Sequence, residues 1–355
     1  MPVNDPSKYP LRVNTAPKKR ARFQVGATAA LVVVIAATGV FLLPQIIAYG
    51  VQQEQTHPSA VTTVATAAPF PVSVDPATKS IVSNPQADQL YANETGSSLT
   101  AAVGDAMNII SWIAALIDNT SLYQSLAAAD GHLIVIEPGY RREQVLNELT
   151  SALGWNKTQQ QQFTETVAQE DPGLTDGMFA PGNYVVNDTM TPSNVAALLN
   201  VKFEQTILLH YGTSTAAYVP LPEALTVASL IEREASGPSD MRIISGIIWN
   251  RLFNNMNLQI DATLQYAMGE NKSGNWWQAV VPKDKYISSS YNTYAHAGLP
   301  PGPIASPSLA AVIAALNPVQ TSCLYYFHDS KGIFHCSDSY TQHVALLKKY
   351  YGQGK

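Results

Sequence analysis

A long stretch without charged side chains, from Phe23 to Gln53, places the strongest constraint on how this chain can fold. Its residues 25–43 (VGATAALVVVIAATGVFLL) are almost all apolar, and a helix of roughly 20 such residues spans a bilayer. The flank on its N-terminal side is basic, and basic flanks stay in the cytoplasm. We therefore expect a cytoplasmic tail (residues 1–22), one transmembrane helix (residues 23–50) and an extracytoplasmic remainder.

The alternative to a retained anchor is a cleaved signal peptide. The apolar run is longer than the apolar core of a usual signal peptide, and no cleavage site with small residues follows it cleanly. We favour the anchor, which makes the chain a single-pass membrane protein with its N-terminus in the cytoplasm.

The charge balance of the extracytoplasmic part argues against a nucleic acid partner. The first 22 residues hold 6 of the 21 basic residues and 1 of the 26 acidic ones, so the remainder has 15 basic and 25 acidic side chains. Neutralising phosphates needs clustered Lys and Arg, which this remainder lacks. With 355 residues, 46% of them hydrophobic, the chain is long enough for one or two packed domains.

Hydrophobic periodicity divides the extracytoplasmic part into three segments and predicts an α+β fold. Residues 51–96 are rich in Ala, Thr, Ser and Pro without a sustained period, which is typical of a linker or stalk. Residues 97–190 contain a predicted strand at Leu133–Ile136, a Pro-Gly turn and a predicted helix at Arg142–Leu153. Helical patterns dominate residues 191–355, which we expect to be a mainly helical domain.

Two cysteines, Cys323 and Cys336, flank the sequence LYYFHDSKGIFH, in which two aromatic-rich arms surround a turn. This pattern predicts a β-hairpin that brings the thiols together. Outside the membrane the compartment is oxidising, so a cross-strand disulfide is the favoured interpretation and two buried free thiols are the alternative.

The sequence offers no motif for metal or cofactor chemistry. It has no CxxC, HExxH, GxSxG or P-loop motif, and its seven histidines show no metal-ligand spacing. We predict neither a metal site nor a cofactor.

A predicted helix from Leu221 to Ser236 holds two candidate catalytic carboxylates, Glu232 and Glu234. Residues three, four and seven positions earlier share a helix face. For Glu234 these are Ile231, Leu230 and Val227, and for Glu232 they are Ser229, Ala228 and Leu225. Only Glu234 therefore faces an apolar stripe, where burial raises the pKa of a carboxyl as a general acid requires.

The pattern alone does not exclude a structural role for Glu234. A buried ion pair with Arg242 or Arg251 is the alternative, and structural pairs of this kind are common. On periodicity alone the ion pair is the favoured interpretation.

Polar and aromatic side chains that suit sugar binding follow this helix. They lie in Asn-Arg at 250–251, in LQIDATLQY at 258–266 and in YNTY at 291–294. The candidate substrate-binding residues are Asn250, Gln259, Asp261, Tyr291, Asn292, Thr293 and Tyr294. Simpler roles compete: Asp261 is placed to cap a helix that begins at Ala262, and the two tyrosines can cover a core.

Six segments together resemble a known family. They are IEREA, NRL, LQIDATLQYAMG, YNTYAHAGLPPGPIASPS, AALNP and LYYF…KGIFHCS. In this order they resemble the endolytic murein transglycosylases of the MltG/YceG-like type, from about Leu133 to His343. IEPGYRREQVLNEL resembles the LysM-like module of that family, whereas Ile260 stands where the family usually has Thr or Ser.

The resemblance implies an activity for Glu234 and a place in the cell. Glu234 would be the acid/base that cleaves the β-1,4 bond between N-acetylmuramic acid and N-acetylglucosamine in nascent peptidoglycan, with 1,6-anhydro ring formation and a role in ending strand elongation. Peptidoglycan synthases (penicillin-binding proteins) would be partners at the bacterial cell membrane. A glycan-binding scaffold without catalysis and a hydrolytic muramidase are the alternatives.

Overall fold

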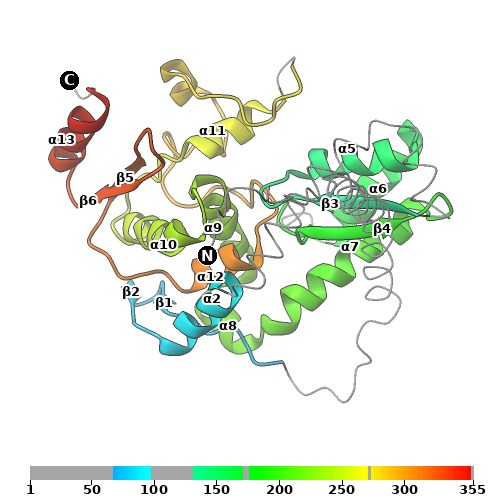
Figure 1. Cartoon of the computed structure of the whole chain (residues 1–355), viewed down its shortest axis with the longest axis horizontal. Helices are drawn as coiled ribbons and strands as arrows, with labels where there is room; N and C mark the ends of the chain where they lie inside the picture. Colours follow the sequence, from blue (N-terminus) through cyan, green and yellow to red (C-terminus); the bar gives the residue numbers. More distant parts are fainter. Residues whose placement is uncertain (1–66, 97–130, 171–175, 271–272, 353–355) are drawn as a thin grey trace, which may run out of the picture.

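A computed structural model describes residues 67–96, 131–170, 176–270 and 273–352 (Figure 1). The predicted transmembrane helix at 23–50 lies outside these ranges. No helix inside them has the length and apolar character that crossing a bilayer needs. The described part is a helix-rich α+β fold with three separate two-stranded antiparallel sheets, so the predicted fold class is confirmed at this level.

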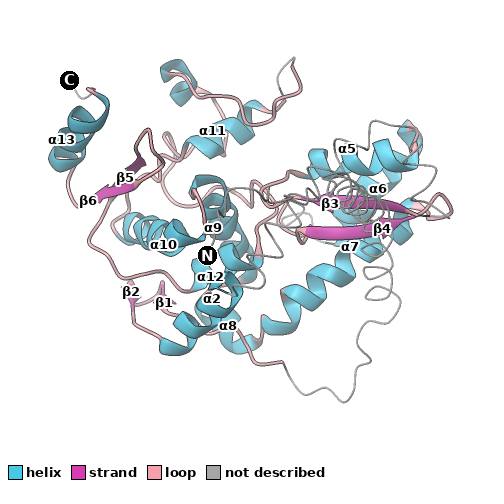
Figure 2. Ribbon diagram, viewed as in Figure 1, coloured by secondary structure: helices cyan, strands magenta, loops and turns pink. Residues whose placement is uncertain are grey.

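The first unit surrounds the sheet of β3 (His132–Ile136) and β4 (Gly182–Val186), shown among helices in Figure 2. Between the two strands the chain forms α5 (Arg142–Leu153) and α6 (Lys157–Glu170). The strand and helix predicted from periodicity are thus both present. Their apolar faces share one core, whose largest fully buried side chains are Tyr184, Phe163, Ile136 and Leu149.

The second unit is built on three packed helices. These are α9 (Leu221–Glu234), α10 (Pro238–Phe253) and α12 (Leu309–Leu316). Helix α12 has the sequence LAAVIAAL and is buried from Ala310 to Leu316, as a helix that is apolar all round must be. Other elements that follow α7 in the chain are η2 (Leu208–His210), α8 (Thr213–Tyr218), α11 (Asp261–Met268), η3 (Pro282–Tyr286), β5 (Tyr325–His328), β6 (Phe334–Ser337) and α13 (Tyr340–Tyr351).

The predicted linker at 51–96 is wrong for its described part, residues 67–96. This segment forms β1 (Val74–Asp75), β2 (Ser80–Ile81) and α2 (Pro85–Gly96) and packs on the second unit. Phe70, Val74 and Tyr91 are buried in its core, and the amide of Ser73 donates to the carbonyl of Leu316. The ring of Phe70 lies 5.3 Å from that of His210, whereas the hydroxyl of Tyr91 donates to the carbonyl of Pro238, so the buried residues of this segment face different parts of the unit.

The boundary predicted between residues 190 and 191 is also displaced. Helix α7 (Pro192–Thr206) contributes Val195 and Leu199 to the core of the first unit, whereas Phe203 belongs to the core of the second. One continuous helix therefore joins the two cores, and the boundary falls inside it.

Candidate active site

Glu234 is the last residue of α9, just after the buried part of that helix. Every residue of α9 from Ala224 to Ile231 is buried, and Glu234 follows as a half-buried side chain. Its Oε2 accepts a hydrogen bond of 2.7 Å from the hydroxyl of Tyr326 on β5. The backbone N–H of Ala262, in the first turn of α11, also donates to this carboxyl.

The environment of Glu234 favours its neutral form. Burial raises its pKa, and the nearby charge of Asp261 raises it further. The hydrogen bonds from Tyr326 and Ala262, with the nearby His328, act in the opposite direction without cancelling the effect of burial. A carboxyl with a raised pKa can give up a proton near neutral pH and take it back, as an acid/base catalyst does.

The structural ion pair considered for Glu234 is wrong. Arg242 instead contacts Asp88 at 2.7 Å, and its Nε donates to the carbonyl of Asn317 at 2.7 Å. Arg251 donates from Nε to the carbonyl of Leu324 at 2.6 Å. Across the described part of the chain, no basic side chain lies within 4.0 Å of the Glu234 carboxyl.

Glu232, the second candidate acid, has a structural role. Its Oε2 accepts two hydrogen bonds from Ser308, one from the backbone N–H at 2.9 Å and one from the hydroxyl at 2.6 Å. Ser308 is the N-cap residue of α12. Glu232 therefore links the start of α12 to α9 through one of its carboxylate oxygens.

Asp261 and Tyr294 lie beside Glu234 and form a pair. The hydroxyl of Tyr294 donates to Oδ1 of Asp261 at 2.6 Å, and Asp261 is exposed. The prediction that Asp261 caps the helix is wrong: α11 begins at Asp261 itself, Ile260 is the N-cap residue, and the Asp261 carboxylate binds Tyr294. The exposed carboxylate and the phenol are available to contact a substrate.

Asn292 and Thr293 are buried, and their side chains hold the backbone around the site through hydrogen bonds. The Asn292 amide nitrogen donates to the carbonyls of Lys285 and Ile287, and its oxygen accepts from the backbone N–H of Tyr294. The Thr293 hydroxyl accepts from the backbone N–H of Ile260. The Thr293 hydroxyl also lies 2.9 Å from the hydroxyl of Thr263. Both side chains are buried and hydrogen-bonded within the protein, so in this structure they support the fold of the site.

The other predicted sugar-binding residues differ in exposure. Gln259 is exposed, with a φ of 53° and a backbone N–H that donates to the carbonyl of Thr293. Tyr291 is half-buried, and its ring centroid lies 4.6 Å from that of Tyr266. Ile260 is 3% exposed and belongs to the core, so its side chain makes no substrate contact.

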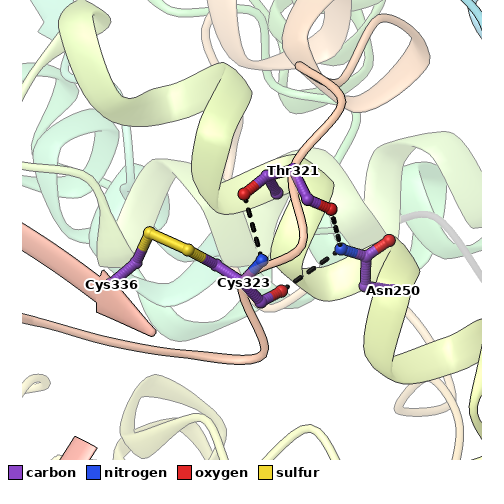
Figure 3. Close-up of a disulfide and its surroundings, with 4 residues drawn as sticks. All are labelled: Asn250, Thr321, Cys323 and Cys336. Atoms are coloured by element: carbon purple, nitrogen blue, oxygen red, sulfur yellow. Dashed lines mark hydrogen bonds between the residues drawn. A yellow bond between two sulfur atoms is a disulfide. The ribbon is translucent and has the colours of Figure 1, made fainter. Parts of the chain in front are cut away.

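Asn250 supports the cysteine hairpin (Figure 3). Its amide nitrogen donates to the carbonyls of Thr321 at 2.7 Å and Cys323 at 3.2 Å. The structure joins Cys323 and Cys336 in a disulfide, and β5 pairs with β6 in the predicted hairpin. Asn250 therefore holds the base of the hairpin, whereas the sequence predicted a substrate contact for it.

Tyr326 is the site residue that the sequence reasoning missed. Alternation along the predicted strand puts Tyr326 and His328 on one face, but it does not say which helix that face meets. In the structure Tyr326 meets Glu234, and Nε2 of His328 lies 2.6 Å from Oδ2 of Asp240 at the start of α10.

The buried carboxyl of Asp176 joins the two units. Asp176 accepts from the backbone N–H of Arg142 at 2.8 Å and from the hydroxyl of Tyr266 at 2.7 Å. Burial raises its pKa. Among the described residues, no group of three or more His, Cys, Asp or Glu side chains is arranged to hold a metal ion.

The sequence profile of the YceG-like family matches residues 82–349, which include α9, the site around Glu234 and the hairpin. The chain belongs to the YceG-like family. A yceG-like protein (lmo1499) of Listeria monocytogenes has a similar crystal structure, with a TM-score of 0.53 and 25% identity. That similarity covers 63% of this chain and 80% of the Listeria chain.

Two curated relatives carry the name endolytic murein transglycosylase. The Bacillus subtilis (strain 168) protein is 31% identical over 225 residues, which are 61% of this chain and 60% of the relative. The Streptococcus pneumoniae (strain ATCC BAA-255 / R6) protein is 30% identical over 168 residues, 46% of this chain and 30% of the relative. The chain thus spans between about a third and three fifths of the relatives it matches.

Proposed function

We propose that this protein is an endolytic lytic transglycosylase of peptidoglycan and that Glu234 is its acid/base. The single observation that carries the proposal is the state of Glu234: a carboxyl with a raised pKa, without a basic partner, beside the polar groups of Asp261 and Tyr294. The names of the Bacillus and Streptococcus relatives support the substrate and the reaction.

In the proposed reaction, one carboxyl serves twice. Glu234 first gives its proton to the glycosidic oxygen between N-acetylmuramic acid and N-acetylglucosamine as that bond breaks. The resulting carboxylate then accepts the proton of the muramoyl C6 hydroxyl, whose oxygen bonds to C1 and closes the 1,6-anhydro ring. Glu234 is protonated again at the end, and no water is consumed.

The second candidate function is a hydrolytic muramidase, and the position of Asp261 is the observation that favours it. Most glycoside hydrolases use two carboxyl groups, one of which activates water or attacks the sugar. Asp261 is exposed and close enough to influence the pKa of Glu234. A scaffold that binds glycans without cutting them is the third possibility, and it leaves the raised pKa of Glu234 without a use.

The proposal extends to the place of the enzyme in the cell. The basic tail (residues 1–22) and apolar span (residues 23–50) support a single-pass anchor in the bacterial cell membrane with the site outside. The order strand, helix, helix, strand in the first unit supports a LysM-like module. An anchored strand-cutting enzyme would meet peptidoglycan synthases as partners.

The chemistry of the new strand ends tests the proposal. The full-length chain in detergent is incubated with purified glycan strands, and the products are analysed by mass spectrometry. The proposal expects internal cuts with 1,6-anhydromuramic ends, and Glu234→Gln should abolish them. Glu223→Gln is the matched control, because Glu223 is an exposed glutamate in the first turn of the same helix.

Each alternative has its own outcome in the same experiment. Reducing muramic ends would show a hydrolytic muramidase, and binding without any product would show a scaffold. Full activity of Glu234→Gln would remove this residue from the mechanism.

A further inference from the structure

The hydroxyl of Tyr326 is the only side-chain donor within the described residues that bonds directly to the Glu234 carboxyl. We propose that Tyr326 is a positioning residue that selects which oxygen of Glu234 exchanges the proton and stabilises the carboxylate after the proton has left. The inference rests on the proposed function, because it assigns a helper to the same acid/base.

The hydrogen bond between Tyr326 and Glu234 has a fixed direction. Burial raises the pKa of Tyr326 well above its ordinary value, so the phenol stays protonated wherever a carboxyl titrates. Tyr326 can therefore only donate to ionised Glu234, and it donates to Oε2 at 2.7 Å. When Glu234 is neutral, Oε2 remains the acceptor and Oε1 carries the proton. In this proposal Oε1 is therefore the oxygen that exchanges the proton with the substrate.

The hairpin meets the end of α9 through two side chains of β5. Tyr326 and His328 lie on the same face of β5, two residues apart. Tyr326 binds Glu234 at the end of α9, while His328 contacts Asp240 near the start of α10. Asp240 also accepts from the backbone N–H groups of Ser236 and Gly237, in the turn between the helices. The hairpin therefore contacts the chain before the turn, at Glu234, and after it, at Asp240.

The hairpin itself is held in place by the disulfide and by helix α10. Tyr326 pairs directly with Cys336 in the antiparallel ladder, and Cys336 is bonded to Cys323. Arg251 and Asn250, both on α10, donate to the carbonyls of Leu324 and Cys323. These contacts fix the register of β5 and with it the position of the Tyr326 hydroxyl.

The energetic consequence is a bond that strengthens as Glu234 loses its proton. A hydrogen bond to a charged acceptor is stronger than one to a neutral acceptor, so the donor favours the carboxylate. It lowers the pKa of Glu234 against the larger effect of burial. Without it, Glu234 should remain protonated to higher pH and give up its proton less readily.

The test compares Tyr326→Phe with Tyr325→Phe in the full-length chain in detergent. Tyr325 is the adjacent tyrosine of β5, and its ring lies over the guanidinium of Arg251, away from Glu234. The loss of a hydrogen bond to a charged group predicts that Tyr326→Phe lowers kcat about 10- to 100-fold, with little change in KM. Tyr325→Phe should keep the wild-type kcat within about twofold, the error of such comparisons.

The pH dependence separates positioning from a merely structural role. The reaction needs protonated Glu234, so its rate falls at high pH as Glu234 ionises. Because Tyr326→Phe raises the pKa of Glu234, that alkaline limb should move to higher pH. A lower rate with an unmoved limb would show lost packing only, and an unchanged kcat with an unmoved limb would contradict the inference entirely.

A direct titration tests the inference without activity. The Glu234 carboxyl carbon is followed by NMR after ¹³C-labelling of glutamate and is assigned by its absence in Glu234→Gln. Its pKa should be higher in Tyr326→Phe than in the wild type and unchanged in Tyr325→Phe. If the wild type yields no product, the proposed function fails, yet the titration still decides whether Tyr326 controls this carboxyl. Equal pKa values in wild type and Tyr326→Phe would overturn the inference.

Discussion

Ser308 donates both its hydroxyl and its backbone N–H to a single oxygen of Glu232, at 2.6 and 2.9 Å. Two residues further along α9, the Glu234 carboxyl accepts from the Tyr326 hydroxyl of the hairpin and from the backbone N–H of Ala262 in α11. Glu232 and Glu234 are two positions apart, so their side chains point to different faces of the helix. For this reason one is a structural glutamate and the other is the proposed acid.

These different roles predict that Glu232→Ala lowers the free energy of unfolding but leaves the cleavage activity of the folded protein largely intact. The change leaves two donors of Ser308 without their acceptor at the start of α12, which should lower the free energy of unfolding by about 1–3 kcal/mol. Urea unfolding measures this loss, with the exposed Glu223→Ala as control. Below its lowered Tm, Glu232→Ala should still produce the ends that the wild type produces. Loss of cleavage in a fully folded Glu232→Ala protein would instead move the acid to Glu232.

The Glu234→Gln variant should lose activity and should be more stable, relative to the wild type, at neutral pH than at low pH. The folded pKa of Glu234 lies above its unfolded value, so the folded state binds more protons between those two values. The stability of the wild type therefore falls as the pH rises from the ordinary carboxyl pKa through the raised one. Glu234→Gln should not show this decrease. Unfolding curves at several pH values measure the difference, and parallel profiles for the two proteins would contradict it.

Regular periodicity made part of this fold predictable. The apolar stripe of α9, the helix Arg142–Leu153 and the hairpin between the cysteines follow from local patterns of 3.6 and 2 residues, and all three are present. The segment 67–96 was predicted as a linker because its buried residues are spaced irregularly. Two two-residue strands and one short helix that pack on different parts of the second unit leave no sustained period in the sequence.

The candidate site was predictable in part for a related reason. The apolar neighbours of Glu234 in α9 are local, so the raised pKa of this residue could be argued from the sequence. Asn292 and Thr293 have the same polar groups as sugar-binding residues, but Asn292 bonds backbone groups of its own loop and Thr293 bonds the backbone of Ile260, 33 positions away. The contact between Tyr326 and Glu234 joins residues 92 positions apart, and no local pattern contains it.

Removing the disulfide should weaken both the fold and the site. Cys323 and Cys336 are 13 residues apart, and closing a loop of this size stabilises a fold by about 3 kcal/mol. The double variant Cys323→Ser/Cys336→Ser should therefore unfold at lower urea concentration. Its kcat should also fall, because the register that places Tyr326 is less restrained. Intact mass with and without reductant checks the bond itself, and two alkylatable thiols in the native protein would refute it.

The proposed mechanism makes its sharpest prediction for Asp261→Asn. The charge of Asp261 raises the pKa of Glu234, so its removal should lower that pKa and move the alkaline limb of the rate to lower pH. This shift is opposite in sign to the one expected for Tyr326→Phe. A transglycosylase with one carboxyl should keep measurable cleavage with 1,6-anhydro ends in Asp261→Asn. A hydrolase that needs Asp261 to activate water should lose all cleavage. The pH–rate profile and the end groups of Asp261→Asn therefore distinguish an electrostatic role of Asp261 from a direct catalytic one. The comparison variant is Tyr294→Phe, which removes only the hydroxyl bound to Asp261.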